Sequence, residues 1–202
     1  MADIKWLTPL VTEPPQIKRE ATWRGKPYQE ASVSNTLVPE YLEQGWELVQ
    51  ERARKSKLRK LWPHDQRLEN RVWYLFYLLG YPELGSGRSF RIRIERSGAD
   101  PIYKQIDVFA KDDETVVVTE CKSSATITKR SLQKDIEEFS SLKGPIANAV
   151  RQHYGSDFKP KIIWLFVTEK IAWSEPDKQW AKGCNINVVT ERELRVASRG
   201  VV

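Results

Sequence analysis

Ile106-Asp107-Val108-Phe109-Ala110 is a short apolar run, and after the charged turn Asp112-Asp113-Glu114 it is followed by Val116-Val117-Val118-Thr119-Glu120-Cys121-Lys122. Such β-branched and apolar runs favour strands, so we expect the two stretches to form an antiparallel hairpin. With an even-numbered loop, such as a turn centred on Asp113-Glu114, Asp107 lies opposite or diagonal to Glu120. Lys122 lies two residues further along and points to the same side as Glu120. The sequence therefore predicts that Asp107, Glu120 and Lys122 share one face of a sheet.

An acidic pair beside a lysine on otherwise apolar strands is costly, because clustered carboxylates repel each other and lose hydration. A bound cation offsets this cost. Two carboxylates and a main-chain carbonyl, for which we expect that of Cys121, can hold Mg²⁺ and leave positions for water and phosphate, and we expect Mn²⁺ to substitute. The ion lowers the pKa of a bound water, while Lys122 orients that water or neutralises charge in the transition state. The pattern predicts phosphodiester hydrolysis without a covalent intermediate.

The sequence around this hairpin predicts an α/β fold. A helix is expected from Pro63 to Leu79, and a strand over Phe90–Glu95 is expected to complete an antiparallel meander with Gln105–Ala110 and Thr115–Lys122. Ile162–Val167 has the apolar continuity of a central parallel strand reached by a crossover helix. A helix is also expected around Leu132–Leu142, after a cap region at Thr126–Thr128, and Gly144 is expected to close it. The capping-box spacing of Thr190 and Glu193 predicts a terminal helix. The other expected elements are a helical stretch over Pro145–Tyr154, a helix over Ser174–Lys182 and a strand over Ile186–Val189.

The N-terminal part of the chain has a different composition. Residues 1–31 contain four prolines and little periodicity, which predicts an extended or partly ordered arm. A helix is expected from Val38 to Val49. The basic run that follows is our candidate for phosphate contacts, with a solvated connector as the alternative, and it consists of Arg52, Arg54, Lys55, Lys57, Arg59 and Lys60. We therefore expect an arm and helix with a basic run over residues 1–60, and a second unit over residues 61–202.

An acid on one core strand followed by Glu-x-Lys on the next resembles the PD-(D/E)XK nuclease superfamily, with Asp107 and Glu120-Cys121-Lys122 as the matching residues. The resemblance covers roughly residues 63–196. It looks closest to the Mrr-like restriction and Holliday-junction-resolvase-like groups, whose members cut DNA using Mg²⁺. It implies a restriction-endonuclease-like αβββαβ core, with a mixed central sheet flanked by helices and an N-terminal helical extension. In one departure, Ile106 replaces the proline that usually precedes the first acid, although that proline is often absent.

The same resemblance implies three further site residues. Glu69, on the helix before the meander, matches the acid that often completes the metal site, and its alternative role is a surface residue favouring the helix N-terminus. Gln133 and Lys129 match polar positions that support the site in some members, with an ordinary solvated helix face as the alternative. For Asp107, Glu120 and Lys122 themselves, the alternative is a set of exposed strand ends. Gln133 is thus expected beside the catalytic residues, and Lys129 beside nucleic acid.

The composition of the chain limits which kind of binding partner and which cellular compartment we expect. The chain of 202 residues has a formal net charge of +6 and a pI near 9.3, which favours a polyanionic partner. Its two cysteines and two histidines argue against a disulfide framework or a structural zinc site, so we expect free thiols and carboxylate ligands. The sequence contains neither a run of eighteen apolar residues nor a signal-peptide pattern. We therefore expect a soluble, cytoplasmic protein that contacts no membrane.

The function that these patterns favour is an Mg²⁺-dependent DNA endonuclease, such as the nuclease module of a restriction or phage-defence protein. The alternative is a nucleic-acid-binding module that retains the nuclease fold without cutting. A structural or protein-interaction domain, suggested by the aromatic-rich arm, is a third reading. Restriction-like domains often work as dimers or beside another domain, so a homodimer or a partner domain or subunit stays open, as does the choice between duplex DNA, a junction, a flap and RNA.

Overall fold

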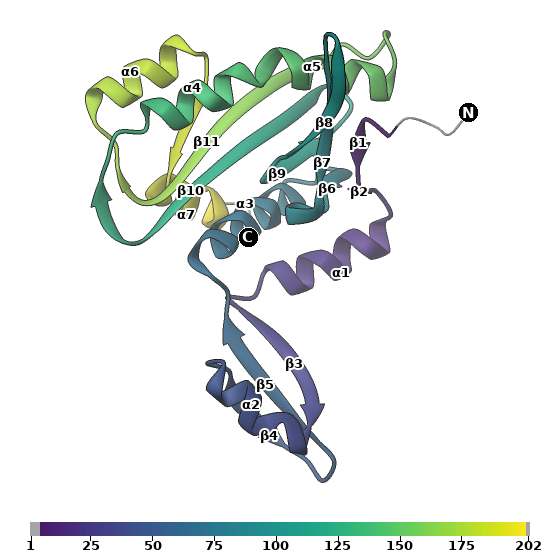
Figure 1. Ribbon diagram of the computed structural model, residues 1–202, viewed down its shortest axis with the longest axis vertical. Coiled ribbons are helices and arrows are strands. Elements are labelled where there is room, and N and C mark those ends of the chain that lie inside the picture. The colour runs from purple at the N-terminus through teal and green to yellow at the C-terminus, as the bar shows by residue number, and fades with distance from the viewer. Residues whose placement is uncertain (1–4, 201–202) are drawn as a thin grey trace.

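A six-stranded mixed sheet forms the centre of the molecule, and helices cover both of its faces (Figure 1). The computed structural model describes residues 5–200, without the side chains of residues 198 and 199. The strands of the central sheet, in spatial order, are β12 (Asn187–Thr190), β11 (Lys161–Ala172), β10 (Thr115–Lys129), β9 (Val108–Lys111), β6 (Glu83–Gly85) and β2 (Leu10–Val11). β10, β11 and β12 are parallel, and the remaining pairs are antiparallel.

Crossover helices follow from the parallel strands, because such strands need a long connection. The helices between them are α4 (Gln133–Ser141), α5 (Lys143–Tyr154) and α6 (Glu175–Gly183). The other face of the sheet is covered by α1 (Pro14–Arg24), α3 (His64–Leu78) and α7 (Glu191–Gly200). The side chains of successive β10 residues alternate between the two faces of the sheet, since Val116 and Val118 pack against α4 and α5 while Val117 packs against α3.

A second sheet explains why the expected three-strand meander is wrong. Its strands are β1 (Leu7–Thr8), β7 (Arg91–Arg96) and β8 (Ala99–Gln105), so β7 pairs with β8 and not with the β9–β10 hairpin. The run expected as one strand, Gln105–Ala110, is divided at Ile106 and Asp107, where the chain leaves one sheet and enters the other. Pro101 concealed β8 from a propensity argument, and the strand tolerates this proline because it lies at a sheet edge.

The N-terminal part of the chain is also more ordered than expected. In place of an extended arm, β1 and β2 pair with strands of the two sheets, and α1 begins with Pro14 and Pro15 in its first turn, where a missing N–H costs nothing. The helix expected to reach Val49 ends earlier. It is α2 (Val38–Glu43), preceded by the short 3₁₀ turn η1 (Asn35–Leu37), and Gly45 at φ +81° turns the chain into a strand.

A third sheet contains the basic run, for which the sequence predicted no strand. It consists of β3 (Tyr28–Ser34), β5 (Lys55–Leu61) and β4 (Glu47–Glu51), in that order. We call this unit, with α2, the small lobe. Figure 1 shows the small lobe projecting from the core beside the end of α1 and the start of α3.

Several other element predictions are confirmed, with shifted ends. α3, β11, α6, β12 and α7 lie close to their expected places, and Glu193 accepts hydrogen bonds from the N–H and hydroxyl of Thr190 at 2.7 Å, as the capping box requires. Gly144 does not close a helix, since α4 ends at Ser141 and Gly144 lies in the first turn of α5. Thr126–Thr128 is part of β10 and not a cap region. None of the helices described over residues 5–200 is both long and apolar enough to cross a membrane.

Candidate active site

The β9–β10 hairpin brings Asp107 and Glu120 together. Its register pairs Lys111 with Val116 and continues to Val108 opposite Thr119, so the next step places Asp107 opposite Glu120. The turn is centred on Asp113-Glu114, because the Asp112 N–H donates to the Thr115 carbonyl at 3.0 Å. Two residues in the loop leave the strands in the even register that puts both carboxyls on one face.

β10 runs on beyond the start of β9, and the candidate site lies at this point. β9 begins at Val108, so beyond Thr119 the backbone of β10 has no strand on that side. The Oδ2 atom of Asp107 accepts a hydrogen bond from the Cys121 N–H at 2.8 Å and thereby replaces the missing strand. The Cys121 side chain packs on the α3 face, and burial raises the pKa of its thiol well above the usual value. This cysteine is therefore a protonated packing residue.

The carboxyl of Asp107 is held in an unfavourable place for a negative charge. Burial raises its pKa to about 7, with further contributions from the negative charges of Glu120 and Glu69 that outweigh the Cys121 N–H and the more distant Lys122. Desolvation and like charge both disfavour the ionised form. The arrangement therefore gains stability when positive charge is brought to this face of the sheet.

Lys122 supplies part of that positive charge. Its Nζ lies 2.7 Å from an oxygen of Glu120 and 3.7 Å from an oxygen of Asp135 on α4. Burial alone lowers the pKa of Lys122, but the two carboxylates outweigh burial and leave the pKa raised. The ammonium therefore stays charged over the physiological range and lies on the same face as Asp107 and Glu120.

Glu69 comes from α3, on the other face of the sheet, and is buried. Burial raises its pKa, although Arg88 opposes the rise through two hydrogen bonds at 3.2 and 3.1 Å. Arg88 lies on the 3₁₀ turn η2 (Gly87–Ser89) and also binds Asp65 at 2.6 Å. The influence of Glu69 on the pKa of Asp107 places it near the hairpin acids, while its oxygens are engaged by Arg88.

The polar residue on α4 that meets the site is Asp135. Gln133 is exposed and donates to Glu137 at 3.3 Å, so the structure does not bring it to the hairpin acids. Asp135 contacts Lys122 and also accepts from Arg130 at 2.6 Å. No signal in the sequence distinguishes Asp135 from the other charged residues of this helix. The same holds for Arg88, which only the tertiary contact with Glu69 identifies.

The basic run lies on the small lobe and is largely paired with neighbouring groups. Lys57 lies 2.6 Å from Glu30, Arg59 lies 3.0 Å from Glu47, and Lys60 donates to a backbone carbonyl. The side chains of Arg54 and Lys55, at the turn between β4 and β5, have no hydrogen-bond or ion-pair partner within residues 5–200. Figure 1 shows this lobe projecting away from the β9–β10 hairpin. Lys129 is exposed at the end of β10.

The donors at the hairpin suit a hard cation. They are the carboxylate oxygens of Asp107 and Glu120 and the main-chain carbonyl of Cys121, and oxygen donors are those that Mg²⁺ prefers. Within residues 5–200, no three His, Cys, Asp or Glu side chains converge as a ready-made metal site. The fit therefore rests on two carboxylates, on the buried, repelled charge of Asp107 and on the unpaired edge of β10 beyond the start of β9.

Comparison with known proteins leaves the family open. No protein-family model and no curated protein matches the chain. Solved structures that match include protein VC1899 from Vibrio cholerae, at 11% identity with a TM-score of 0.49, covering 93% of this chain and 50% of that one. Protein AF1548, of unknown function, matches at 19% identity and 0.43, covering 64% and 63%. Can2 from Sulfobacillus thermosulfidooxidans, in complex with cyclic tetra-adenylate, matches at 13% and 0.42, covering 93% and 50%.

This chain therefore spans half of the length of two of these proteins and 63% of the third. At TM-scores below 0.5 and such low identities, the likenesses establish neither a shared family nor a shared activity. The interpretation of the site depends on its own geometry.

Proposed function

We propose that this chain is a metal-dependent nuclease of the PD-(D/E)XK type that hydrolyses DNA phosphodiester bonds with Mg²⁺. The observation that carries the proposal is the common face of Asp107, Glu120 and Lys122, with the pKa of Asp107 raised to about 7 by burial and by neighbouring acids. Acids whose charge is disfavoured in the protein alone, beside a charged lysine, are typical of sites that gain their balance from a ligand.

Two carboxylates would hold the ion, together with the main-chain carbonyl of Cys121. When bound, Mg²⁺ supplies Lewis-acid polarisation of the phosphate and a more acidic water. Asp107 is fixed for this role by the Cys121 N–H at 2.8 Å. Glu69 would be a further ligand of the ion, and Arg88 holds its carboxylate in place.

Lys122 is the residue that would face the phosphate. Its raised pKa keeps it protonated, so it neutralises charge on a phosphate oxygen and does not act as a base. Asp135 lies 3.7 Å from Nζ and keeps the ammonium over the hairpin when Glu120 turns to a cation. Asp135 is therefore a positioning residue in this proposal.

Cleavage of plasmid and linear DNA by the full chain, with Mg²⁺ and with chelator, tests the proposal. We expect Mg²⁺-dependent cleavage that falls by a factor on the order of 100 to 1,000 in Glu120→Gln and in Lys122→Met, the cost of removing one charge-stabilising group. Glu114→Gln is the matched control, because Glu114 is exposed in the turn of the same hairpin. Full activity in Glu120→Gln, or equal loss in the control, would contradict the assigned site.

One observation favours a second candidate, a nucleic-acid-binding module that does not cut. Lys122 already pairs with Glu120, and Arg88 already pairs with Glu69, so the protein's own cations neutralise part of the acidic cluster. That function predicts strongly salt-dependent DNA binding and no turnover with Mg²⁺ or Mn²⁺. The same cleavage experiment, read beside a binding titration, separates the two candidates.

A further inference from the structure

Three parallel strands end at the same edge of the central sheet. The register pairs Lys129 of β10 with Ala172 of β11, and Thr168 of β11 with Thr190 of β12. Ligands of open α/β sheets bind outside the carboxyl ends of such strands. Two hollows of about 480 Å³ each lie here, and Trp173, the residue that follows β11, lines both of them.

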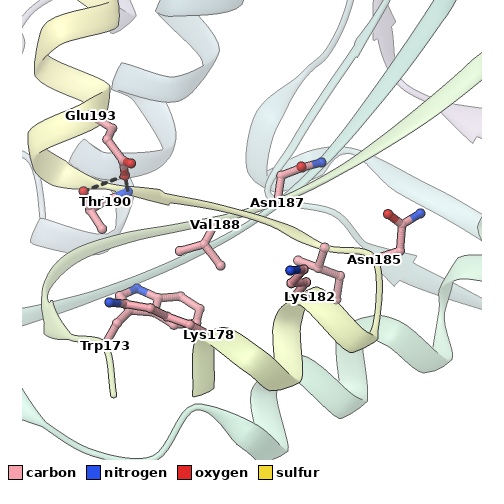
Figure 2. A pocket seen from close by; sticks show the side chains of 9 residues that line it. Trp173, Lys178, Lys182, Asn185, Asn187, Val188, Thr190 and Glu193 are labelled. Atoms are coloured by element: carbon pink, nitrogen blue, oxygen red, sulfur yellow. Dashed lines mark hydrogen bonds between the residues drawn. The ribbon is translucent and has the colours of Figure 1, made fainter. Parts of the chain in front are cut away.

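The first hollow lies between α6 and the edge strand β12. Figure 2 shows Lys178 and Lys182 on α6 at one side of it, Asn187 and Val188 at the other, and Trp173 at one end. Among the described residues β12 pairs with β11 alone, and its residues Asn187, Val188 and Thr190 line this hollow. The hollow therefore combines ammonium groups, side-chain amides and an aromatic ring.

The second hollow shares Trp173 with the first. Lys129 and Arg130 line it. Arg130 lies 2.6 Å from Asp135, which in turn lies 3.7 Å from the Nζ of Lys122. One carboxylate is thus shared between the candidate catalytic lysine and the wall of this hollow.

Four cations and two acids line the two hollows, namely Lys178, Lys182, Lys129 and Arg130 against Asp177 and Glu193. The acids stay ionised but are directed to local donors, because Asp177 accepts from Ser174 and from the Leu132 N–H, and Glu193 accepts from Thr190. The ammonium groups of Lys129 and Lys182 have no hydrogen-bond or ion-pair partner in the described residues. The surface is therefore suited to a polyanion and not to a cation.

We propose that the two hollows that share Trp173 bind an unpaired nucleic-acid strand that leads to Lys122. A hollow of about 480 Å³ falls within the range of small-ligand pockets and accommodates single nucleotide units. The indole of Trp173 is half-buried, since its Nε1 donates to Thr168 at 2.8 Å and its ring meets Phe166 edge to face, and its exposed part offers a surface on which an unpaired base can stack. Paired bases in a duplex hide these faces. The inference takes nucleic acid as the substrate class from the proposed function and adds a single-stranded segment as the form recognised.

The test measures binding in the absence of divalent ions, so it does not depend on cleavage. Full-length Glu120→Gln protein is titrated against a labelled single strand and against the duplex of the same sequence, with anisotropy as the readout. We expect tighter binding of the single strand. Lys129→Glu with Lys182→Glu should weaken that binding at least tenfold and reduce the salt dependence, since each lost phosphate contact removes about 0.7 from the logarithmic slope.

The matched control carries the same change of charge at the opposite end of β11. Lys159→Glu with Lys161→Glu alters two exposed lysines at the amino end of the strand. Trp173→Ala should weaken single-strand binding about tenfold, and Trp173→Phe should retain most of it, because a stacking ring remains. Equal loss in the control pair, or duplex bound as tightly as the single strand, would overturn the inference. Single-strand binding through this surface without any cleavage by the unmodified chain would overturn only the nuclease proposal.

Discussion

The hairpin site and the small lobe both cluster charged side chains, but they treat those charges differently. On the β9–β10 hairpin, acids extend from buried strands, and the pKa of Asp107 is raised to about 7. On the small lobe, Lys57 and Arg59 are half exposed and lie 2.6 and 3.0 Å from Glu30 and Glu47. Surface pairs of this kind contribute at most about 1 kcal/mol. The comparison teaches that burial, and not the number of charges in the sequence, marks where a ligand is required.

The largest expected effect is on stability, at Asp107. Its pKa rises from an ordinary 3.8 to about 7 in the folded chain, so the folded state binds the proton more tightly than the unfolded state. The contribution of Asp107 to the free energy of unfolding is therefore greatest at low pH, and it is lost as the pH rises from about 4 to about 7. With about 1.4 kcal/mol per tenfold change in proton affinity, the loss is about 4 kcal/mol above pH 7 without a cation.

Asp107→Asn removes this charge and keeps the shape of the side chain. We expect it to raise the free energy of unfolding at pH 8 without divalent ions, and to match the unmodified chain near pH 4. Denaturant titrations at the two pH values measure this, with Asp113→Asn in the exposed turn of the same hairpin as the control. If Asp107→Asn is less stable than the unmodified chain at pH 8, the buried charge is not a cost, and the contrast between the two regions fails.

A smaller effect is expected on the small lobe. The side chains of Arg54 and Lys55 are unpaired within the described residues, so changing both to alanine should weaken duplex binding a fewfold and reduce the logarithmic salt slope by about 1.8. Lys57→Ala with Arg59→Ala removes the same charge but breaks two ion pairs, which leaves Glu30 paired with Lys26 alone and Glu47 with no ion-pair partner in the described residues. A larger loss from Lys57 and Arg59 would show that the pairing seen here gives way to phosphate contacts.

The sequence could predict the hairpin because its information is local. A β-branched run, a two-residue turn and a period of two are enough to place Asp107 and Glu120 on one face. The small lobe and β8 could not be predicted in this way. Pro101 is tolerated at an edge strand, and whether a strand lies at an edge is a property of the whole sheet.

The supporting residues of the site, Asp135 and Arg88, can likewise be identified only from tertiary contacts. Asp135 and Gln133 both lie at the start of α4, and only the angle of that helix over β10 decides that Asp135 meets Lys122. Arg88 reaches Glu69 from a 3₁₀ turn 19 residues later in the chain. Local patterns carry no information on either contact.

Divalent-ion binding tests the central claim most directly. Calorimetric titration of Mn²⁺ or Mg²⁺ into the full chain at pH 7.5 should reveal binding that Asp107→Asn and Glu120→Gln each abolish and that Glu114→Gln leaves unchanged. Proton release on binding is also expected, because the pKa of Asp107 lies near 7 in the free chain. Binding of equal strength in all four proteins would contradict the claim that the hairpin carboxylates form an ion site.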